Sequence, residues 1–236
     1  MQSNLFIFKQ FVIWQDKCAF RVGTDAVLLG AVADVAWKKR ILDIGTGTGL
    51  IALMMAQRSR AEVYAIEPDN DSFTQATENI RRSRWAGRIR VENCRLQDFF
   101  PENIKFDLIV SNPPFFIDSL KNPDPAKSNS RHNENLTHKD LLEGAARLLD
   151  NKGNLQIILP RDEGTLFEEQ AVNYGFYCSN IMKIKPLPAS EIKRLIMIFS
   201  RIKKKPSESY LTIGKDIRHN FTEEYIHLTK DFYVKF

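Results

Sequence analysis

Short apolar runs alternate with helix-forming segments along most of the chain, and this alternation constrains the fold more than any other feature. The apolar runs are 40–44, 62–66, 88–93, 106–110 and 154–159. The helix-forming segments are 48–58, 69–81, 139–149 and 162–174. Strands that alternate with helices predict a parallel sheet with helices on both faces. Residues 176–184 and 192–202 predict two long strands without a helix between them, and therefore an antiparallel edge pair.

A chain of 236 residues with 43% hydrophobic side chains is long enough for one well-buried domain. We expect no membrane association, because no apolar run reaches the length of a membrane span and the N-terminus lacks the pattern of a signal peptide. Cys18, Cys94 and Cys178 are scattered and odd in number, which favours reduced thiols in the cytoplasm over a disulfide framework. The sequence contains no CxxC pair and no close pair of histidines, so it does not predict a metal site.

Positive charge is concentrated in two segments of a chain whose net charge is +5. The first segment carries Arg81, Arg82 and Arg84, and the second carries Lys203 and Lys204. This charge balance is compatible with a nucleic-acid partner. Each cluster taken alone is more often a solvated face, so charge by itself does not decide the partner.

A glycine-rich turn, residues 45–49 (GTGTG), joins the first predicted strand to its helix. Glycines permit backbone angles that other residues avoid and let a ligand approach the main chain. Open α/β sheets bind ligands at this end of their strands. Glu67 ends the next strand, where a carboxylate suits a ribose diol. The alternative explanation is a tight turn without a ligand.

Two cofactor classes compete for this turn. A dinucleotide-binding turn has a third glycine where this chain has Leu50, and Asp43 would lie badly beside a pyrophosphate. Asp43 suits a ligand with an amino group, which favours S-adenosylmethionine over NAD. Asp98 follows the third predicted strand, where it can hydrogen-bond the amine of an adenine ring, although a lone aspartate there is more often a turn or cap residue.

The NPPF motif, residues 112–115, follows the fourth predicted strand and faces the cofactor across the end of the sheet. The carbonyl groups of the Asn112 side chain and the Pro113 backbone can accept both hydrogens of a planar amine. Phe115 can stack on the ring that carries the amine. Such a site holds an amine beside a methyl donor without a covalent nucleophile. A stiff Pro-Pro turn is the alternative explanation of the motif alone.

Together, residues 43–49 (DIGTGTG) and the NPPF motif resemble class I S-adenosylmethionine-dependent amino-methyltransferases. The blocks 8–30 and 225–233, with Arg131 and His132 between them, resemble more closely the bacterial tRNA1(Val) (adenine(37)-N6)-methyltransferases. The similarity extends over nearly the whole chain. It implies a Rossmann-like fold with helices on both faces of a seven-stranded, mostly parallel sheet, whose one antiparallel edge-type strand is inserted between two others.

The resemblance also implies how the single domain is divided and which residues hold the cofactor. Residues 1–35 would cover the cofactor, 36–202 would form the core sheet, and 203–236 would pack on that core as an extension. Asp43 and the three glycines would hold the methionine end of S-adenosylmethionine, Glu67 the ribose and Asp98 the adenine. The implied cofactor-binding residues are Thr24, Asp25, Asp43, Gly45, Gly47, Gly49, Glu67, Asp98 and Asn112.

The implied reaction is methyl transfer to adenine N6 in a tRNA anticodon loop, with S-adenosylhomocysteine as the second product. The implied catalytic residues are Asn112, Pro113, Pro114 and Phe115. We expect tRNA contacts from Arg81, Arg82, Arg84, Arg131, His132, Lys203 and Lys204. A monomer without a metal ion is favoured.

Other functions share parts of this pattern. Methyltransferases of ribosomal guanine N2 and of release-factor glutamine also carry NPPF, but they usually add a duplicated domain or an N-terminal helical domain, and this sequence has neither. DNA adenine methyltransferases usually add a separate target-reading region, and none is evident in this sequence. An NAD-dependent oxidoreductase is disfavoured by Leu50 at the position of the third glycine. A non-catalytic RNA-binding module is the remaining alternative.

Overall fold

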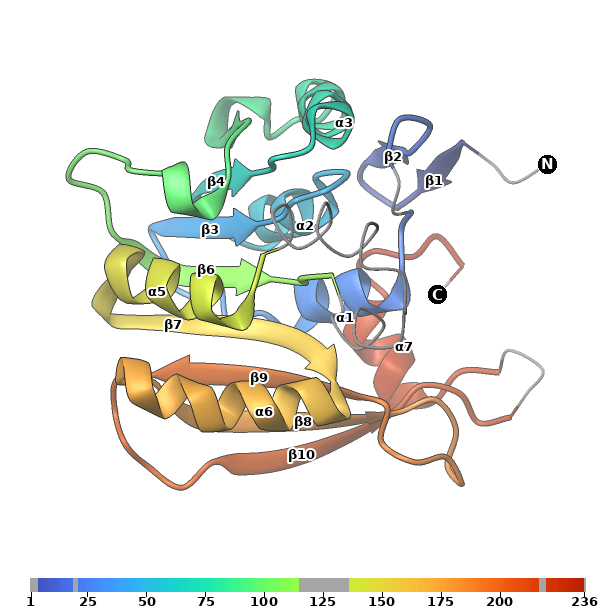
Figure 1. Ribbon diagram of the computed structural model, residues 1–236. Helices are drawn as coiled ribbons and strands as arrows, with labels where there is room; N and C mark the ends of the chain where they lie inside the picture. Colours follow the sequence, from blue (N-terminus) through green and yellow to red (C-terminus); the bar gives the residue numbers. More distant parts are fainter. Residues whose placement is uncertain (1–3, 19–20, 115–135, 217–219, 236) are drawn as a thin grey trace, which may run out of the picture.

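The computed structural model describes residues 4–18, 21–114, 136–216 and 220–235, and its centre is an eight-stranded sheet (Figure 1). The sheet strands are β3 (Arg40–Ile44), β4 (Glu62–Ile66), β5 (Ile89–Glu92), β6 (Phe106–Ser111), β7 (Leu149–Pro160), β8 (Tyr177–Lys185), β9 (Arg194–Ser200) and β10 (Ser207–Thr212). Their spatial order is β10-β8-β9-β7-β6-β3-β4-β5. β9 is antiparallel to both of its neighbours, and every other neighbouring pair is parallel. The predicted α/β fold with a mostly parallel sheet is confirmed.

The antiparallel strand β9 lies between β7 and β8, which agrees with the inserted strand that the resemblance implied. The sheet differs from the expected one in one detail. β10 is an eighth strand where seven were expected, and it lies within residues 203–236. Its sequence, SESYLT, has no apolar run because an edge strand has a neighbour on one side only, and Tyr210 is 62% exposed. The pattern that predicts buried strands therefore misses it.

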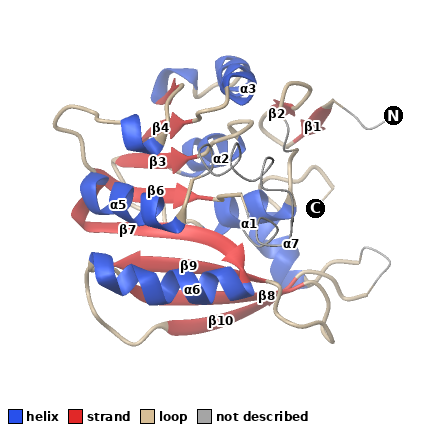
Figure 2. Ribbon diagram, in the orientation of Figure 1, coloured by secondary structure: helices blue, strands red, loops and turns tan. Residues whose placement is uncertain are grey.

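Helices cover both faces of the sheet, as Figure 2 shows. The helices are α1 (Thr24–Val32), α2 (Leu50–Arg58), α3 (Asn70–Arg81), α5 (His138–Leu148), α6 (Arg161–Ala171) and α7 (Glu223–Thr229), with 3-10 turns η1 (Ala86–Arg88), η2 (Leu96–Asp98) and η4 (Val172–Tyr174). Side chains alternate along a strand, so Ile41 enters the core with α1 and α2, and Leu42 enters the core with α5 and α6. None of these described helices is both long and apolar enough to cross a membrane.

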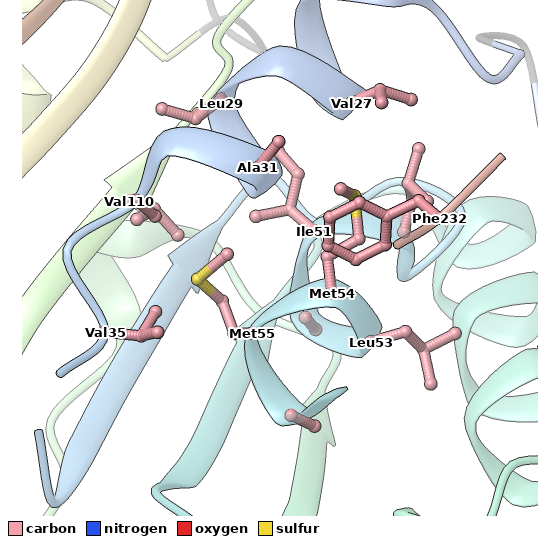
Figure 3. Close-up of a cluster of buried hydrophobic side chains, with 14 of the residues drawn as sticks. Val27, Leu29, Ala31, Val35, Ile51, Leu53, Met54, Met55, Val110 and Phe232 are labelled. Carbon is pink, nitrogen blue, oxygen red and sulfur yellow. The ribbon is translucent and has the colours of Figure 1, made fainter. Parts of the chain in front are cut away.

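The core on the α2 face joins segments that are far apart in the sequence (Figure 3). Leu29 and Ala31 of α1 are buried with Ile51 and Met55 of α2, and Phe232 near the C-terminus enters the same cluster. Burial of a large apolar side chain contributes about 1.5–3 kcal/mol. This packing fixes α1 and the C-terminal segment against the helix that follows the glycine-rich turn.

An N-terminal hairpin of β1 (Leu5–Ile7) and β2 (Val12–Trp14) lies beside α3 and outside the main sheet. The buried Asn79 of α3 anchors it. Asn79 Oδ1 accepts from Trp14 N at 2.9 Å, and Asn79 Nδ2 donates to the carbonyls of Trp14 at 2.8 Å and Thr48 at 2.9 Å. One side chain therefore joins the hairpin, α3 and the glycine-rich turn.

The C-terminal segment fastens the same hairpin near its turn. Lys9 N donates to the Phe232 carbonyl at 2.8 Å, and Phe8 and Tyr233 form an isolated β-bridge. The rings of Phe8 and Tyr233 stack with their centroids 5.9 Å apart. Segments near the two ends of the chain therefore pack together, on the side to which the arrows of β3, β4 and β6 point (Figure 1).

We predict that Asn79→Ala lowers the free energy of unfolding by about 2–4 kcal/mol, because the buried Thr48 carbonyl and the part-buried backbone groups of Trp14 lose their partner. Chemical denaturation followed by circular dichroism measures this loss. Thr74→Ala is the matched control, since the Thr74 hydroxyl donates to the Asn70 carbonyl on the exposed side of the same helix. Equal unfolding free energies for the two variants would contradict the anchoring role of Asn79.

Candidate active site

Parallel pairing brings the carboxyl ends of three strands together at one end of the sheet. Ile44, the last residue of β3, pairs with Ile66 of β4 on one side and with Ser111 of β6 on the other. Neighbouring strands lie about 4.8 Å apart, and the Ser111 hydroxyl donates to the Ile44 carbonyl at 3.0 Å. The residues that directly follow these three strands are Gly45, Glu67 and Asn112.

The glycine-rich turn needs its glycines for two different reasons. Gly45, Gly47 and Gly49 have φ angles of 71°, 55° and 81°, a region that L side chains rarely adopt. A Cβ atom on Gly45 or Gly47 would meet nothing within 4 Å, so the main chain there is open to a ligand. A Cβ atom on Gly49 would lie 3.3 Å from Ile80 Cδ1 of α3. Gly49 therefore serves helix packing, and the other two leave room for a ligand.

Asp43 is a fully buried carboxylate whose two oxygens have different surroundings. Its Oδ2 accepts from Thr46 Oγ1 at 2.6 Å and from Ala52 N, in the first turn of α2, at 3.1 Å. Its Oδ1 has no hydrogen-bond partner among the described residues. Burial raises the pKa of Asp43 to about 7. A cationic amine at Oδ1 would satisfy this oxygen and stabilise the charged form.

Glu67 holds the glycine-rich turn in place. Its Oε2 accepts from Gly47 N at 2.8 Å, and its Oε1 accepts from Asp69 N at 3.1 Å. Asp69 in turn caps α3 by accepting from Ser72 N at 2.8 Å. Burial raises the pKa of Glu67, although both backbone N–H groups oppose that rise. The carboxylate predicted for the ribose therefore also couples the turn to α3.

The end of β6 presents a buried acceptor, the side-chain oxygen of Asn112. Asn112 Oδ1 is buried and has no hydrogen-bond partner among the described residues. Pro113 is buried and Pro114 is exposed. A buried acceptor without a partner costs free energy unless a ligand supplies a donor. The geometry therefore fits a donor group bound between the glycine-rich turn and the NPPF motif.

Two of the predicted cofactor residues form ion pairs with arginine side chains. Asp98 lies exposed in η2 and accepts from Arg95 Nε at 2.8 Å. Asp25, in the first turn of α1, accepts from Arg194 Nε of β9 at 2.7 Å. Thr24 is the first residue of α1. The ion pair of Asp25 with Arg194 fixes the start of α1 to the end of the sheet where β9 begins.

The predicted RNA-contacting residues do not form one surface. Arg81, Arg82 and Arg84 lie at and after the end of α3, beside the hairpin. Lys203 and Lys204 follow β9. The last residue of β9 pairs with the first residue of β8, so these lysines lie at the end of the sheet where the parallel strands begin, opposite the candidate site. Phe115, Arg131 and His132 lie outside the described residues. No group of metal-ligating side chains occurs in the described part of the chain.

Three polar residues near the site were not predicted from the sequence. Gln75 and Asn79 are buried, four residues apart on α3, and Gln75 Oε1 accepts from Lys17 N at 2.9 Å. Two amides on the buried face of an amphipathic helix are the signal that would have indicated a docked segment. Arg194 had no such signal, because its partner Asp25 is 169 residues away.

Comparison with known proteins identifies the class. Residues 20–168 match the family described as methyltransferase small domain. A predicted O-methyltransferase from Agrobacterium tumefaciens has a TM-score of 0.64 and 19% identity, over 88% of this chain and 96% of its own. The structure described as Pyrococcus horikoshii TYW2 in complex with MeSAdo has a TM-score of 0.60 and 19% identity, over 86% of this chain and 74% of its own. The fold and the site define an S-adenosylmethionine-dependent methyltransferase.

Close relatives identify the family. The tRNA1(Val) (adenine(37)-N6)-methyltransferase of Bacteroides fragilis (strain YCH46) is 45% identical over 237 residues, with 100% of both chains covered. Those of Trichodesmium erythraeum (strain IMS101) and Flavobacterium psychrophilum (strain ATCC 49511) are 45% and 42% identical, over 100% and 98% of this chain and 100% of their own. The chain belongs to the tRNA1(Val) (adenine(37)-N6)-methyltransferase family, and the predicted resemblance is confirmed.

We predict that the affinity for S-adenosylhomocysteine falls about tenfold when the pH is lowered from 8 to 6. Asp43 has a pKa of about 7 because it is buried, and the ammonium group of the ligand binds only its ionised form. Binding below pH 7 therefore requires the release of a proton. Calorimetric titration at each pH, in buffers of different ionisation enthalpy, measures both the affinity and the proton release.

Asp43→Asn is the control for this titration, because an amide has no charge to lose. We expect weak binding that is the same at both pH values. A wild-type affinity that does not change between them would contradict the role of Asp43 in binding the ammonium group.

Proposed function

We propose that this chain transfers the methyl group of S-adenosylmethionine to the N6 amine of adenine 37 in a valine tRNA, the activity that its relatives' names state for them. One observation carries the proposal: Asn112 Oδ1 is a buried acceptor without a described partner, and it lies one strand away from the glycine-rich turn. An unpaired acceptor in that place suits the N–H group of a planar amine.

The residues around the glycine-rich turn fit S-adenosylmethionine, which when bound supplies a methyl group on a sulfonium sulfur. Asp43 Oδ1 is the oxygen available to an ammonium group, and the open sides of Gly45 and Gly47 leave room for the methionine end. Glu67 is proposed for the ribose hydroxyls and Asp98 for the adenine amine. For that role Asp98 must share its carboxylate with Arg95, which already donates to it.

The N-terminal segment is proposed to close over the cofactor. Thr24 and Asp25 begin α1, and Arg194 holds the Asp25 carboxylate at 2.7 Å. Asp25 then acts by positioning α1, while the helix end itself borders the site.

The NPPF motif is proposed to orient the target amine. Asn112 Oδ1 and the Pro113 carbonyl accept the two N–H groups, which holds the amine nitrogen in place and directs its lone pair out of the ring plane. Both carbonyl oxygens carry partial negative charge, so they stabilise the positive charge that develops on nitrogen during methyl transfer. Pro113 and Pro114 stiffen this segment, and Phe115 is proposed to stack on the adenine.

The adenine must leave its stack to enter the site, since enzymes that act on a base within folded nucleic acid turn it out. Arg81, Arg82, Arg84, Arg131, His132, Lys203 and Lys204 remain the proposed tRNA contacts. The chain is proposed to act in the cytoplasm as a monomer without a metal ion.

Methylation of total tRNA with labelled S-adenosylmethionine, followed by nucleoside analysis, tests this function. We expect N6-methyladenosine in one valine tRNA at position 37. Label in N2-methylguanosine or in protein glutamine would instead identify the activity with one of the other planar-amine methyltransferases.

We predict that Asn112→Ala lowers kcat about 10²- to 10³-fold, because one of the two acceptors for the target amine is lost. The affinity for S-adenosylhomocysteine should fall much less than kcat, because Asn112 is only one of several residues proposed to hold the cofactor, and calorimetry checks this on the same preparation. Asn112→Asp keeps an acceptor oxygen and should retain more activity than Asn112→Ala. Wild-type turnover by the alanine variant would show that Asn112 does not hold the target.

A further inference from the structure

The outward face of the N-terminal hairpin is unusually apolar for an exposed surface. The pairs Leu5 with Trp14 and Ile7 with Val12 place these four side chains on one face, opposite the fully buried Ile13. Ile7, Val12 and Trp14 are 56%, 37% and 36% exposed. Contiguous exposed apolar side chains of this kind mark interaction sites. We call this surface the hairpin face.

Two arginines lie beside the hairpin: Arg82 borders the hairpin face, and Arg84 contacts the hairpin turn. The guanidinium carbon of Arg82 lies 5.2 Å from the centre of the Trp14 ring, within the range of a cation–π contact. Arg84 Nη2 donates to Gln10 Oε1 in the hairpin turn at 2.5 Å, and its guanidinium lies 4.9 Å from the centre of the Trp85 ring. Cationic groups stacked beside an exposed aromatic ring are typical of surfaces that bind unpaired bases and the phosphates between them.

The hairpin face is rigidly connected to the active site. Asn79 bonds the backbone of Trp14 on one side and the Thr48 carbonyl of the glycine-rich turn on the other. Four residues closer to the start of α3, Gln75 Oε1 accepts from Lys17 N. A group bound on Trp14 is therefore held at a fixed place relative to the cofactor residues.

We propose that the hairpin face binds single-stranded RNA of the anticodon loop, with one unpaired base stacked on Trp14 and the adjoining phosphates near Arg82 and Arg84. This inference rests on the proposed function and extends it to the nucleotides around the target. The two guanidinium groups disfavour an apolar protein segment. The exposed Trp14 ring beside them favours RNA over an acidic segment, because RNA supplies both phosphates and unpaired bases that stack. The nearby Glu78 is neutralised by Lys17, whose Nζ lies 2.5 Å from Glu78 Oε1.

An anticodon stem–loop carrying fluorescein, titrated at several salt concentrations, tests the proposal by fluorescence anisotropy. We expect Trp14→Ala to raise Kd about tenfold, because a stacked base is lost. We expect Arg82→Gln to lower the slope of log Kd against log salt by about 0.7 to 1, because one phosphate contact is lost. The backbone of Trp14 stays anchored by Asn79, so the variant should keep its affinity for S-adenosylhomocysteine.

Matched controls come from the opposite end of the sheet, where the parallel strands begin. Trp37 is 98% exposed in the turn before β3, and the exposed Arg60 precedes β4. Trp37→Ala and Arg60→Gln should leave both Kd and the salt slope as in the wild type. If Trp37→Ala and Arg60→Gln change Kd and the salt slope as much as Trp14→Ala and Arg82→Gln do, binding is non-specific and the hairpin face is not the RNA site.

Steady-state methylation of the same stem–loop separates failure of the inference from failure of the proposed function. We expect Trp14→Ala to raise KM with little change in kcat. If the wild type methylates the stem–loop and the Trp14 and Arg82 variants bind and react equally well, the hairpin face is overturned and the function stands. If the wild type methylates no RNA, the proposed function is wrong, and so is the inference that the hairpin face binds the anticodon loop. A dimer in sedimentation that Trp14→Ala abolishes would instead assign this face to a second copy of the chain.

Discussion

The parallel register of β3 with its two neighbours is the constraint on which the site depends. Because Ile44 pairs with both Ile66 and Ser111, β3, β4 and β6 end at the same level, at one end of the sheet. The residues that come next are separated by more than twenty positions in the sequence, yet they border a single space. A shift of one residue in either pairing would turn Asp43 or the residues near Asn112 to the opposite face.

This arrangement includes buried polar atoms that have no partner in the described part of the chain. Asp43 Oδ1 and Asn112 Oδ1 have no hydrogen-bond partner among the described residues. Unpaired buried acceptors destabilise a fold, and such atoms are found where a ligand completes the bonding. The two oxygens differ in what they suit, because a carboxylate prefers a cation and an amide oxygen prefers a neutral N–H group. The site thus offers one place for an ammonium group and another for a planar amine.

The segments near both ends of the chain contribute to this region without belonging to the parallel strands. Asn79 and Gln75 anchor the residues from Trp14 to Lys17 along α3, and Phe232 secures the start of the hairpin turn through Lys9. Residues 8–30 and 225–233 carry the resemblance to this family, and these two segments are joined through Lys9 and Phe232. We infer that they provide the part of the surface that meets the nucleic acid, and we assign the target amine to the NPPF motif.

Much of the fold follows from the sequence, because buried parallel strands require apolar runs and surface helices require an apolar stripe. The glycine-rich turn, Asp43, Glu67 and the NPPF motif could also be found there, since backbone freedom and hydrogen-bonding capacity are properties of residue types. The edge strand β10 and the small hairpin could not, since they are short and partly exposed and so lack a strong pattern. The ion pair of Asp25 with Arg194 and the contact of Arg82 with Trp14 join residues far apart in the sequence. The sequence by itself determined the buried strands of the sheet, the glycine-rich turn and the NPPF motif. Only the tertiary structure decided which acceptors stay unpaired and which arginines lie beside an exposed aromatic ring, because burial and proximity arise from packing between distant segments.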